Sequence, residues 1–277
     1  MRLEKNLDPN PIQEKLKTAV TTFKEAMPIV KALRNEYLNE QHWAQIKGLI
    51  KKDFDINQPD FTLDSLIALD VNQFQEEITS ISTQATQEFR LRQQLQEIDD
   101  VYKKTNFEIT FNEKVECNIL GSPEELYTIL DETLANINMI LGSRFVKPLR
   151  KEAEEWKGYI NKLCEMVDVW YAVQRSWMYL ENIFKAPDIK KAMPVETKNF
   201  EAVDKNFKIL MLKTAKDPKC INIVRKAGKT LDDLTHFNDV LDDVQKKLED
   251  YMEMKRRAFP RFYFLSNDEL IDILANS

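Results

Sequence analysis

The sequence predicts an all-α protein, an elongated array of antiparallel helical bundles with one small β-hairpin near residues 107–119. Long segments repeat apolar residues every three or four positions, which is the spacing of a helix face. Glycine occurs only 5 times in 277 residues, so folds that depend on many tight turns are disfavoured. Hydrophobic residues make up 43% of the chain and charged residues 31%, a composition that favours long helices with solvated faces.

The first third of the sequence predicts three helices and one further helical turn. One covers residues 12–38, and Pro28 inside it predicts a kink or a break. A short helix follows from His42, and Thr62 is a candidate cap for a further helical turn. A longer helix covers residues 71–102. The apolar members of the first helix are Leu16, Val20, Phe23, Ile29, Val30 and Leu33.

The period then changes from helical to alternating. Two short alternating runs around Asn112 and Glu113 predict the β-hairpin. Ser122, Pro123 and Glu125 follow as cap, first helical residue and capping-box partner of a helix that extends to about residue 141. The residues expected to point one way along each run are Phe107, Ile109 and Phe111, then Val115, Cys117 and Ile119.

The strongest helical pattern covers residues 148–184. Its apolar seam carries three of the four tryptophans, Trp156, Trp170 and Trp177, which we expect to stiffen the central bundle. The full seam adds Ile160, Leu163, Val167, Val173, Leu180 and Phe184.

Three more helices are predicted toward the C-terminus. They cover residues 195–216, residues 220–226 with Gly228 as the stop, and a long segment from residue 231. The last has a heptad seam of Leu234, Phe237, Leu241, Val244, Leu248 and Tyr251. Two and a half repeats are too short to demand a coiled coil, so packing in an antiparallel bundle is the favoured interpretation.

No motif in this sequence predicts catalysis, a cofactor or a metal. The stretch AGKT from Ala227 resembles the end of a phosphate-binding loop, but Ile223 stands where that loop needs a glycine. His42 and His236 have no Cys or His neighbours at metal-ligand spacing, so we expect surface or half-buried helix residues. The three widely spaced cysteines predict reduced, packed thiols.

Charge and hydropathy exclude two further classes. A net charge of -6 argues against a general nucleic-acid binder, which normally presents a basic face. No apolar run approaches the roughly 18 residues of a membrane span. The start of the chain lacks the apolar core of a signal peptide.

The most unusual stretch is the aromatic run FPRFYF. Pro260 cannot continue the preceding helix and pushes Phe259 toward extended backbone. Phe262, Tyr263 and Phe264 then present bulky rings in several directions, and the simplest interpretation is a buried corner between two helices.

The helix after this corner is predicted to begin at Ser266, with a capping box to Glu269. It breaks off after barely two turns. We take this to indicate that a partner surface lies in residues absent from the chain.

Four stretches in family order resemble dynein heavy chains. FPRFYFLSNDELIDIL resembles the signature of the linker region, and WYAVQRSWMYLENIF resembles its tryptophan-bearing helix. AMPIVKALRNEYLNEQHW, followed by FTLDSLIAL, resembles the segment that enters the linker from the tail. GSRFVKPLRKEAEEW is similar to axonemal more than to cytoplasmic heavy chains.

The resemblance implies a mechanical lever in an ATP-driven motor that moves toward microtubule minus ends. Residues 1–105 would form a helical bundle at the junction of tail and linker, and residues 106–277 an incomplete linker segment. The implied partners are the downstream ATPase ring of the same chain and, through the tail, dynein intermediate and light chains. Microtubules would be contacted only through absent domains, and the implied location is the cytoplasmic cytoskeleton, in a ciliary or flagellar axoneme.

The residues alone leave two alternatives to the lever. One is a stand-alone helical scaffold that binds protein partners, which would also suit the charged faces and the heptad. The other is an enzyme with an unrecognised site. Within the lever interpretation, the corner from Phe259 to Ser266 is a candidate bend.

Overall fold

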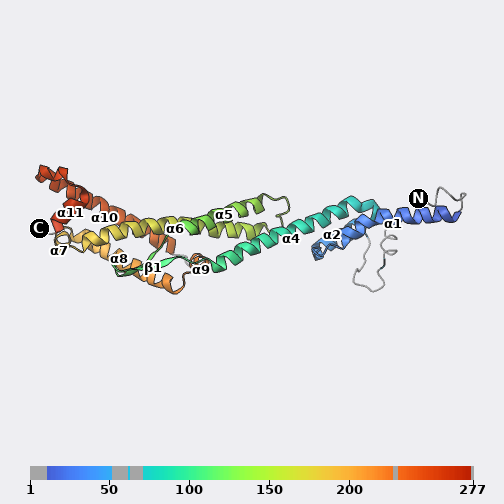
Figure 1. Cartoon of the computed structure of the whole chain (residues 1–277), viewed down its shortest axis with the longest axis horizontal. Helices are drawn as coiled ribbons and strands as arrows, with labels where there is room; N and C mark the ends of the chain where they lie inside the picture. Colours follow the sequence, from blue (N-terminus) through green and yellow to red (C-terminus); the bar gives the residue numbers. More distant parts are fainter. Residues whose placement is uncertain (1–10, 52–61, 63–70, 227–229, 276–277) are drawn as a thin grey trace. The chain divides into compact units, whose positions relative to one another are not determined.

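The computed structural model describes residues 11–51, 62, 71–226 and 230–275 of the chain (Figure 1). The chain divides into two compact units. The first contains residues Met1–Gln94 and Gly142–Arg150, and the second contains Leu95–Leu141 and Lys151–Ser277. The described part is helical apart from one two-stranded hairpin, as the sequence predicts.

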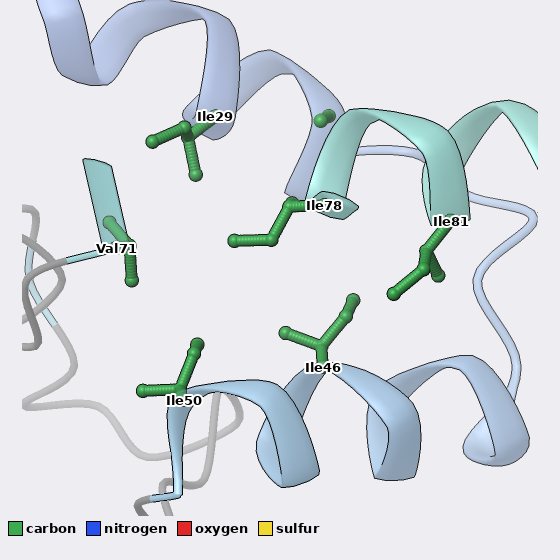
Figure 2. Close-up of a cluster of buried hydrophobic side chains, with 7 residues drawn as sticks. Ile29, Ile46, Ile50, Val71, Ile78 and Ile81 are labelled. Atoms are coloured by element: carbon green, nitrogen blue, oxygen red, sulfur yellow. The ribbon is translucent and has the colours of Figure 1, made fainter. Parts of the chain in front are cut away.

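The first unit is built on helices α1 (Pro11–Leu33) and α2 (Glu40–Ile50), the 3-10 turn η2 (Val71–Phe74) and the first part of α4 (Gln75–Lys104). Side chains from these elements point toward one another in a shared apolar core (Figure 2). Its labelled members are Ile29, Ile46, Ile50, Val71, Ile78 and Ile81.

Helix α1 differs from its prediction in three ways. It is continuous through Pro28, so the predicted break is wrong. Burial of Ala26, Ile29 and Ala32 along one face offsets the hydrogen bond that the proline removes. The helix ends at Leu33 rather than at residue 38, and the apolar residues of its first turns are exposed rather than packed.

The turn after α1 is held by Asn35. Its side-chain amide donates to the Ser82 carbonyl at 2.8 Å and to the Thr86 hydroxyl at 2.8 Å, both on α4. Because these bonds need a turn at Asn35, they explain the early end of α1.

Helix α2 begins with a capping box that contains His42. The Asn39 side chain accepts from the His42 backbone N–H at 3.0 Å, and the His42 Nδ1 accepts from the Asn39 N–H at 3.3 Å. The His42 Nε2 lies 3.1 Å from Glu88 Oε2, and the imidazole is almost fully buried. The expectation of a surface or half-buried histidine is therefore wrong here, because the cap and Glu88 satisfy both nitrogens. His236 is exposed, as expected.

The predicted hairpin is present. Strands β1 (Ile109–Asn112) and β2 (Cys117–Leu120) pair antiparallel, with Ile109 opposite Leu120. Phe107 and Cys117 are buried, whereas Phe111 is exposed. The inward alternation predicted for the first run therefore does not reach its end.

The start of α5 (Glu124–Gly142) corrects another expectation. The Ser122 backbone N–H donates to the Glu108 carboxylate at 3.1 Å, in place of the predicted capping box with Glu125. Glu108 approaches closely because Gly121 lacks a side chain: a Cβ there would lie 2.6 Å from Glu108 Cδ. The residue just before β1 thus supplies the carboxylate that the helix itself was expected to provide.

The second unit is dominated by α6 (Arg150–Phe184), and every predicted member of its seam is buried. Helices α7 (Pro187–Ala192), α8 (Pro194–Lys216) and α9 (Cys220–Lys226) follow. Helix α10 (Thr230–Ala258) packs against α8, and the hairpin lies against α8 as well (Figure 1). The α10 seam is buried as predicted as far as Leu248, beyond which Met252 replaces the partly exposed Tyr251 as the buried residue.

The last elements are the 3-10 turn η3 (Pro260–Phe264) and α11 (Asn267–Ala275). Two expectations lie outside the described residues: the helical turn that Thr62 would cap, and the stop at Gly228. The three cysteines are free thiols, as predicted, with Cys117 and Cys220 buried.

Candidate functional site

The three seam tryptophans of α6 contact different neighbouring elements. Trp177 packs on Phe207 of α8, with ring centroids 4.8 Å apart, and its indole Nε1–H donates to Asp204 Oδ1 at 2.9 Å. The Lys208 Nζ lies 2.9 Å from the same carboxylate oxygen and 5.8 Å from the indole centroid. Helices α6 and α8 are therefore joined by an aromatic contact and a charge-assisted network.

Trp170 packs on Phe107, just before β1, at 5.4 Å between centroids. Trp156 packs on Tyr102 at the end of α4 at 6.0 Å. Burial raises the pKa of Tyr102 to about 12, so this phenol stays neutral. One helix thus ties the end of α4, the entry to the hairpin and α8 into one packed body within the second unit.

Arg225 of α9 extends this network at Trp156. Its guanidinium lies 5.5 Å from the Trp156 ring centroid and 5.6 Å from that of Tyr159. It also lies 3.8 Å from the Asp99 carboxylate on α4. The guanidinium therefore joins α9 to α6 through cation–π contacts with two aromatic rings.

Gln174 fastens the hairpin to α6, and the sequence reasoning did not single it out. Its side-chain oxygen accepts from the Leu120 N–H at 2.8 Å, and its amide donates to the Leu120 carbonyl at 2.9 Å. Tyr171 donates to the Gly121 carbonyl at 3.1 Å. The available signal was a glutamine between Trp170 and Trp177 at seam spacing, because a buried polar residue needs a partner.

The aromatic run forms η3, and no residue of that element is buried. Phe259 has the extended backbone that Pro260 predicts, with φ -136° and ψ 91°. The interpretation as a buried corner is wrong, because Phe264 is 91% exposed, and Phe259 and Tyr263 are also exposed. The chain turns here through hydrogen bonds rather than through packed rings.

Arg256, in the last turn of α10, holds that turn together. Its guanidinium donates to the Phe262 carbonyl at 3.4 Å, to the Leu265 carbonyl at 3.1 Å and to Asn267 Oδ1 at 2.8 Å. No sequence signal distinguished Arg256 from its neighbours in a basic segment. One side chain therefore joins α10, η3 and the start of α11.

Two further contacts fix the same turn. Tyr263 donates to Glu253 Oε1 at 2.9 Å, and this hydrogen bond, followed by Arg257, holds the pKa of Glu253 below its ordinary value. The predicted capping box of α11 is confirmed, with the Ser266 N–H donating to Glu269 Oε2 at 2.8 Å and the Glu269 N–H to Ser266 Oγ at 3.2 Å. These Ser266 contacts lower the pKa of Glu269.

The described residues offer little for covalent or metal chemistry. Burial raises the pKa of each thiol, that of Cys220 to about 12, so the reactive thiolate is disfavoured. Within the described ranges, His, Cys, Asp and Glu side chains form no group of three that could hold a metal ion. None of the helices in those ranges is long and apolar enough to cross a bilayer.

Comparison with known families decides what kind of chain carries these features. The family described as "Dynein heavy chain, N-terminal region 2" matches residues 1–277. This chain belongs to the dynein heavy chain family. The resemblance carried by the tryptophan helix and the aromatic run is thereby confirmed at the level of the family.

The dynein heavy chains to which it is similar include axonemal and flagellar ones. The chain is 38% identical over 277 residues to dynein axonemal heavy chain 6 of Homo sapiens, covering all of this chain and 7% of the relative. It is 37% identical over 267 residues to human dynein axonemal heavy chain 2, covering 96% of this chain and 6% of the relative. It is 32% identical over 281 residues to the Dynein-1-alpha heavy chain, flagellar inner arm I1 complex, of Chlamydomonas reinhardtii. This match covers 100% of this chain and 6% of the relative. The chain thus spans a small fraction of the length of these dynein heavy chains.

Proposed function

We propose that this chain is the tail-proximal and middle part of the linker of a dynein heavy chain, a mechanical lever. In this role it transmits the ATP-driven conformational change of the motor ring to the tail. The observation that carries the proposal is the tryptophan seam of α6, which packs the end of α4, the hairpin and α8 into one body. Packed cores resist deformation, and a lever must resist deformation to transmit force.

In this proposal residues 1–105 form the junction with the tail, and residues 106–277 form the linker segment. The turn at Phe259 to Ser266 is a rigid joint, because Arg256 and the Ser266–Glu269 box hold it by hydrogen bonds. In this proposal catalysis is carried out by other parts of the heavy chain. Its partners are the ATPase ring of the same heavy chain and, through the tail, intermediate and light chains.

The proposed location is the axonemal cytoskeleton of a cilium or flagellum. The axonemal names of the similar heavy chains support it. Movement toward microtubule minus ends is part of the proposal and depends on domains outside residues 1–277.

The test is Trp177→Leu in the full heavy chain. The smaller side chain leaves a cavity against Phe207 and removes the donor to Asp204, so the α6–α8 contact weakens by about 2–4 kcal/mol. We expect ATP turnover to persist while microtubule gliding slows several-fold, because the ring still cycles but the lever transmits less of the motion.

The matched control is Met139→Ser, an exposed apolar residue on α5. It should leave both rates unchanged. Normal gliding by the Trp177 variant, or ATP turnover that falls in parallel with gliding, would contradict the lever. A chain that binds partners but lacks any mechanical effect would favour the scaffold alternative.

A further inference from the structure

A groove runs along the surface of the second unit between α8 and α10. It has a volume of about 440 Å³, and the residues that line it all belong to these two helices. The buried side chains of Val203 and Phe237 are part of this lining. Because they close the groove from below, it lies over the packed core and does not open into it.

An apolar row borders the groove on α8. Ala202 lines the groove and is exposed. Val195 and Ile209 are 61% and 40% exposed. The three residues are seven positions apart, about two helical turns, so they lie along one line on the helix surface. A straight apolar row beside a groove is the kind of surface on which an amphipathic helix lies.

The α10 side of the groove is negatively charged. Asp239 and Asp243 line it, and Asp239 has no ion-pair partner among the described residues. The Lys247 Nζ lies 3.3 Å from the Asp243 carboxylate and 3.9 Å from that of Glu196. Two carboxylates and one amine leave this end with one negative charge, to which Asp239 adds another. A partner that covers this side therefore needs basic residues.

The outer side of the α8 row is positively charged. Asn206, four residues after Ala202, lines the groove. Lys205, three residues after Ala202, therefore lies on the other side of the row, away from the groove. Lys198 lies one heptad earlier on the same side. Both lysines are exposed and make no ion pair with another described residue. The apolar row thus runs between a positive edge on α8 and a negative edge on α10.

These edges decide between classes of occupant. The carboxylates on α10 repel the phosphates of nucleic acids and of anionic lipids. In a symmetric pair, a second copy of the chain would bring the same groove to this one, so that two hollows would face each other. A single helix is convex and fills a groove between two others.

The composition of the groove favours a partner that binds reversibly. Permanently covered interfaces bury mostly apolar side chains. Here the amides of Asn199 and Asn206 and the carboxylates of Asp239 and Asp243 line the groove. Such a surface stays soluble when it is uncovered, which suits a separate polypeptide better than a fixed segment of the same chain.

We propose that the groove between α8 and α10 binds an amphipathic helix of a separate polypeptide. That helix carries a row of apolar residues that packs on Ala202 and its neighbours in the row. Its basic edge faces Asp239 and Asp243, and its acidic edge faces Lys198 and Lys205. The inference does not depend on the lever role, because it uses only the groove and its charges.

The test is zero-length carbodiimide cross-linking of the complete heavy chain with the polypeptides that copurify with it, followed by mass spectrometry. This reagent joins a lysine amine to a carboxylate in direct contact. We expect Asp239 to link to a lysine, and Lys198 or Lys205 to a carboxylate, within one helical segment of one associated polypeptide. The two linked positions should lie on opposite edges of an apolar row. The Lys190–Glu201 pair, whose charged atoms are 3.1 Å apart, reports that the reagent has worked.

A charge reversal tests the same contact by its strength. Asp239→Lys should lower the amount of the linked polypeptide that the washed complex retains by roughly fivefold, because repulsion replaces attraction. Changing the linked lysine of the partner to glutamate should restore retention, which it could not do if the first change had damaged the fold. The matched control is Glu249→Lys, an exposed position of α10 outside the groove, which should leave retention unchanged.

Several results would overturn the proposal. Links from Asp239 to another part of the same heavy chain or to a second copy would do so, and a mixture of isotope-labelled and unlabelled heavy chains separates these two cases. Absent links beside a normal Lys190–Glu201 link would also overturn it, as would links to a segment without the two charged edges. Equal retention in Asp239→Lys and Glu249→Lys would show that the groove does not hold the polypeptide. None of these readouts uses motility, so the lever and the groove can fail independently.

Discussion

At the scale of single residues, Gln174 is the clearest case of a polar side chain that determines packing. It satisfies both backbone groups of the buried residue Leu120. Replacing it by methionine keeps the volume but leaves a buried N–H and a buried carbonyl without partners. We expect Gln174→Met to destabilise the second unit by about 2–4 kcal/mol and to speed hydrogen exchange of the Leu120 amide.

The matched control is Gln245→Met on α10. Gln245 makes an exposed side-chain hydrogen bond to Glu249 at 3.2 Å, so its loss should cost less than about 0.5 kcal/mol. Equal effects of the two variants in urea unfolding would show that the clamp on Leu120 contributes nothing special.

Glu253 permits a titration test of the turn at η3. The Tyr263 hydroxyl is the largest cause of its lowered pKa. The pKa of Glu253 is lower in the folded chain than in the unfolded chain. The contact therefore stabilises the folded chain at a pH above the unfolded-state pKa, and this stabilisation is lost as the pH falls through the folded-state pKa. Tyr263→Phe should raise the pKa of Glu253 toward 4.5, followed by NMR of its carboxyl carbon. The control Phe264→Ala keeps the Tyr263 hydroxyl and should leave the pKa of Glu253 unchanged. An unchanged pKa of Glu253 in Tyr263→Phe would rule out this hydrogen bond in solution.

At the scale of elements, periodicity predicted most of the fold, because a helix that packs on one side repeats apolar residues every three or four positions and a strand alternates them. The seam of α6 follows from the first pattern and the hairpin from the second. What the sequence could not predict was set by contacts between distant residues. Asn35 ends α1 by bonding to α4, and Glu108 replaces the expected Glu125 at the start of α5.

The candidate site follows the same division. The buried tryptophans were predictable as seam members. Arg256 and Gln174 were not, because their partners are backbone groups that only the folded turn and hairpin bring within reach. The aromatic run was recognised in the sequence, but its exposure was not predicted. A sequence shows how large the side chains are, but not which parts of the fold lie around them.

Helix α1 yields a prediction at this scale. Pro28 interrupts the backbone hydrogen bonds of a continuous helix, and burial of Ile29 and Ala32 offsets that loss. Pro28→Ala should therefore stabilise the first unit by about 1–2 kcal/mol, after allowance for the freer unfolded chain. Urea unfolding measures this. Pro194→Ala, at the first position of α8, should give no gain, and a loss of stability in Pro28→Ala would show that α1 needs the proline.

At the scale of the whole molecule, the exposed aromatic run allows an effect on force to be distinguished from an effect on the stability of the fold. Phe264 is almost fully exposed, and Phe262 makes one edge-on contact with Phe259 at 4.9 Å between centroids. Alanine at both positions should therefore cost the isolated chain less than about 1 kcal/mol, unlike changes in the α6 seam. In the full heavy chain we nevertheless expect Phe262→Ala with Phe264→Ala to lower gliding speed or stall force if the chain is the proposed lever, because the exposed rings lie at the joint between α10 and α11.

The measurement is microtubule gliding and single-motor force at matched ATP turnover. Met254→Ala, which removes another exposed apolar side chain from α10, is the control and should glide normally. A double variant with normal speed and force would remove the mechanical role of the run while leaving the α6 body as a lever. A double variant that is slow but also unfolds at lower urea would assign the effect to stability, since the proposed role requires rings that contribute to force and not to the fold.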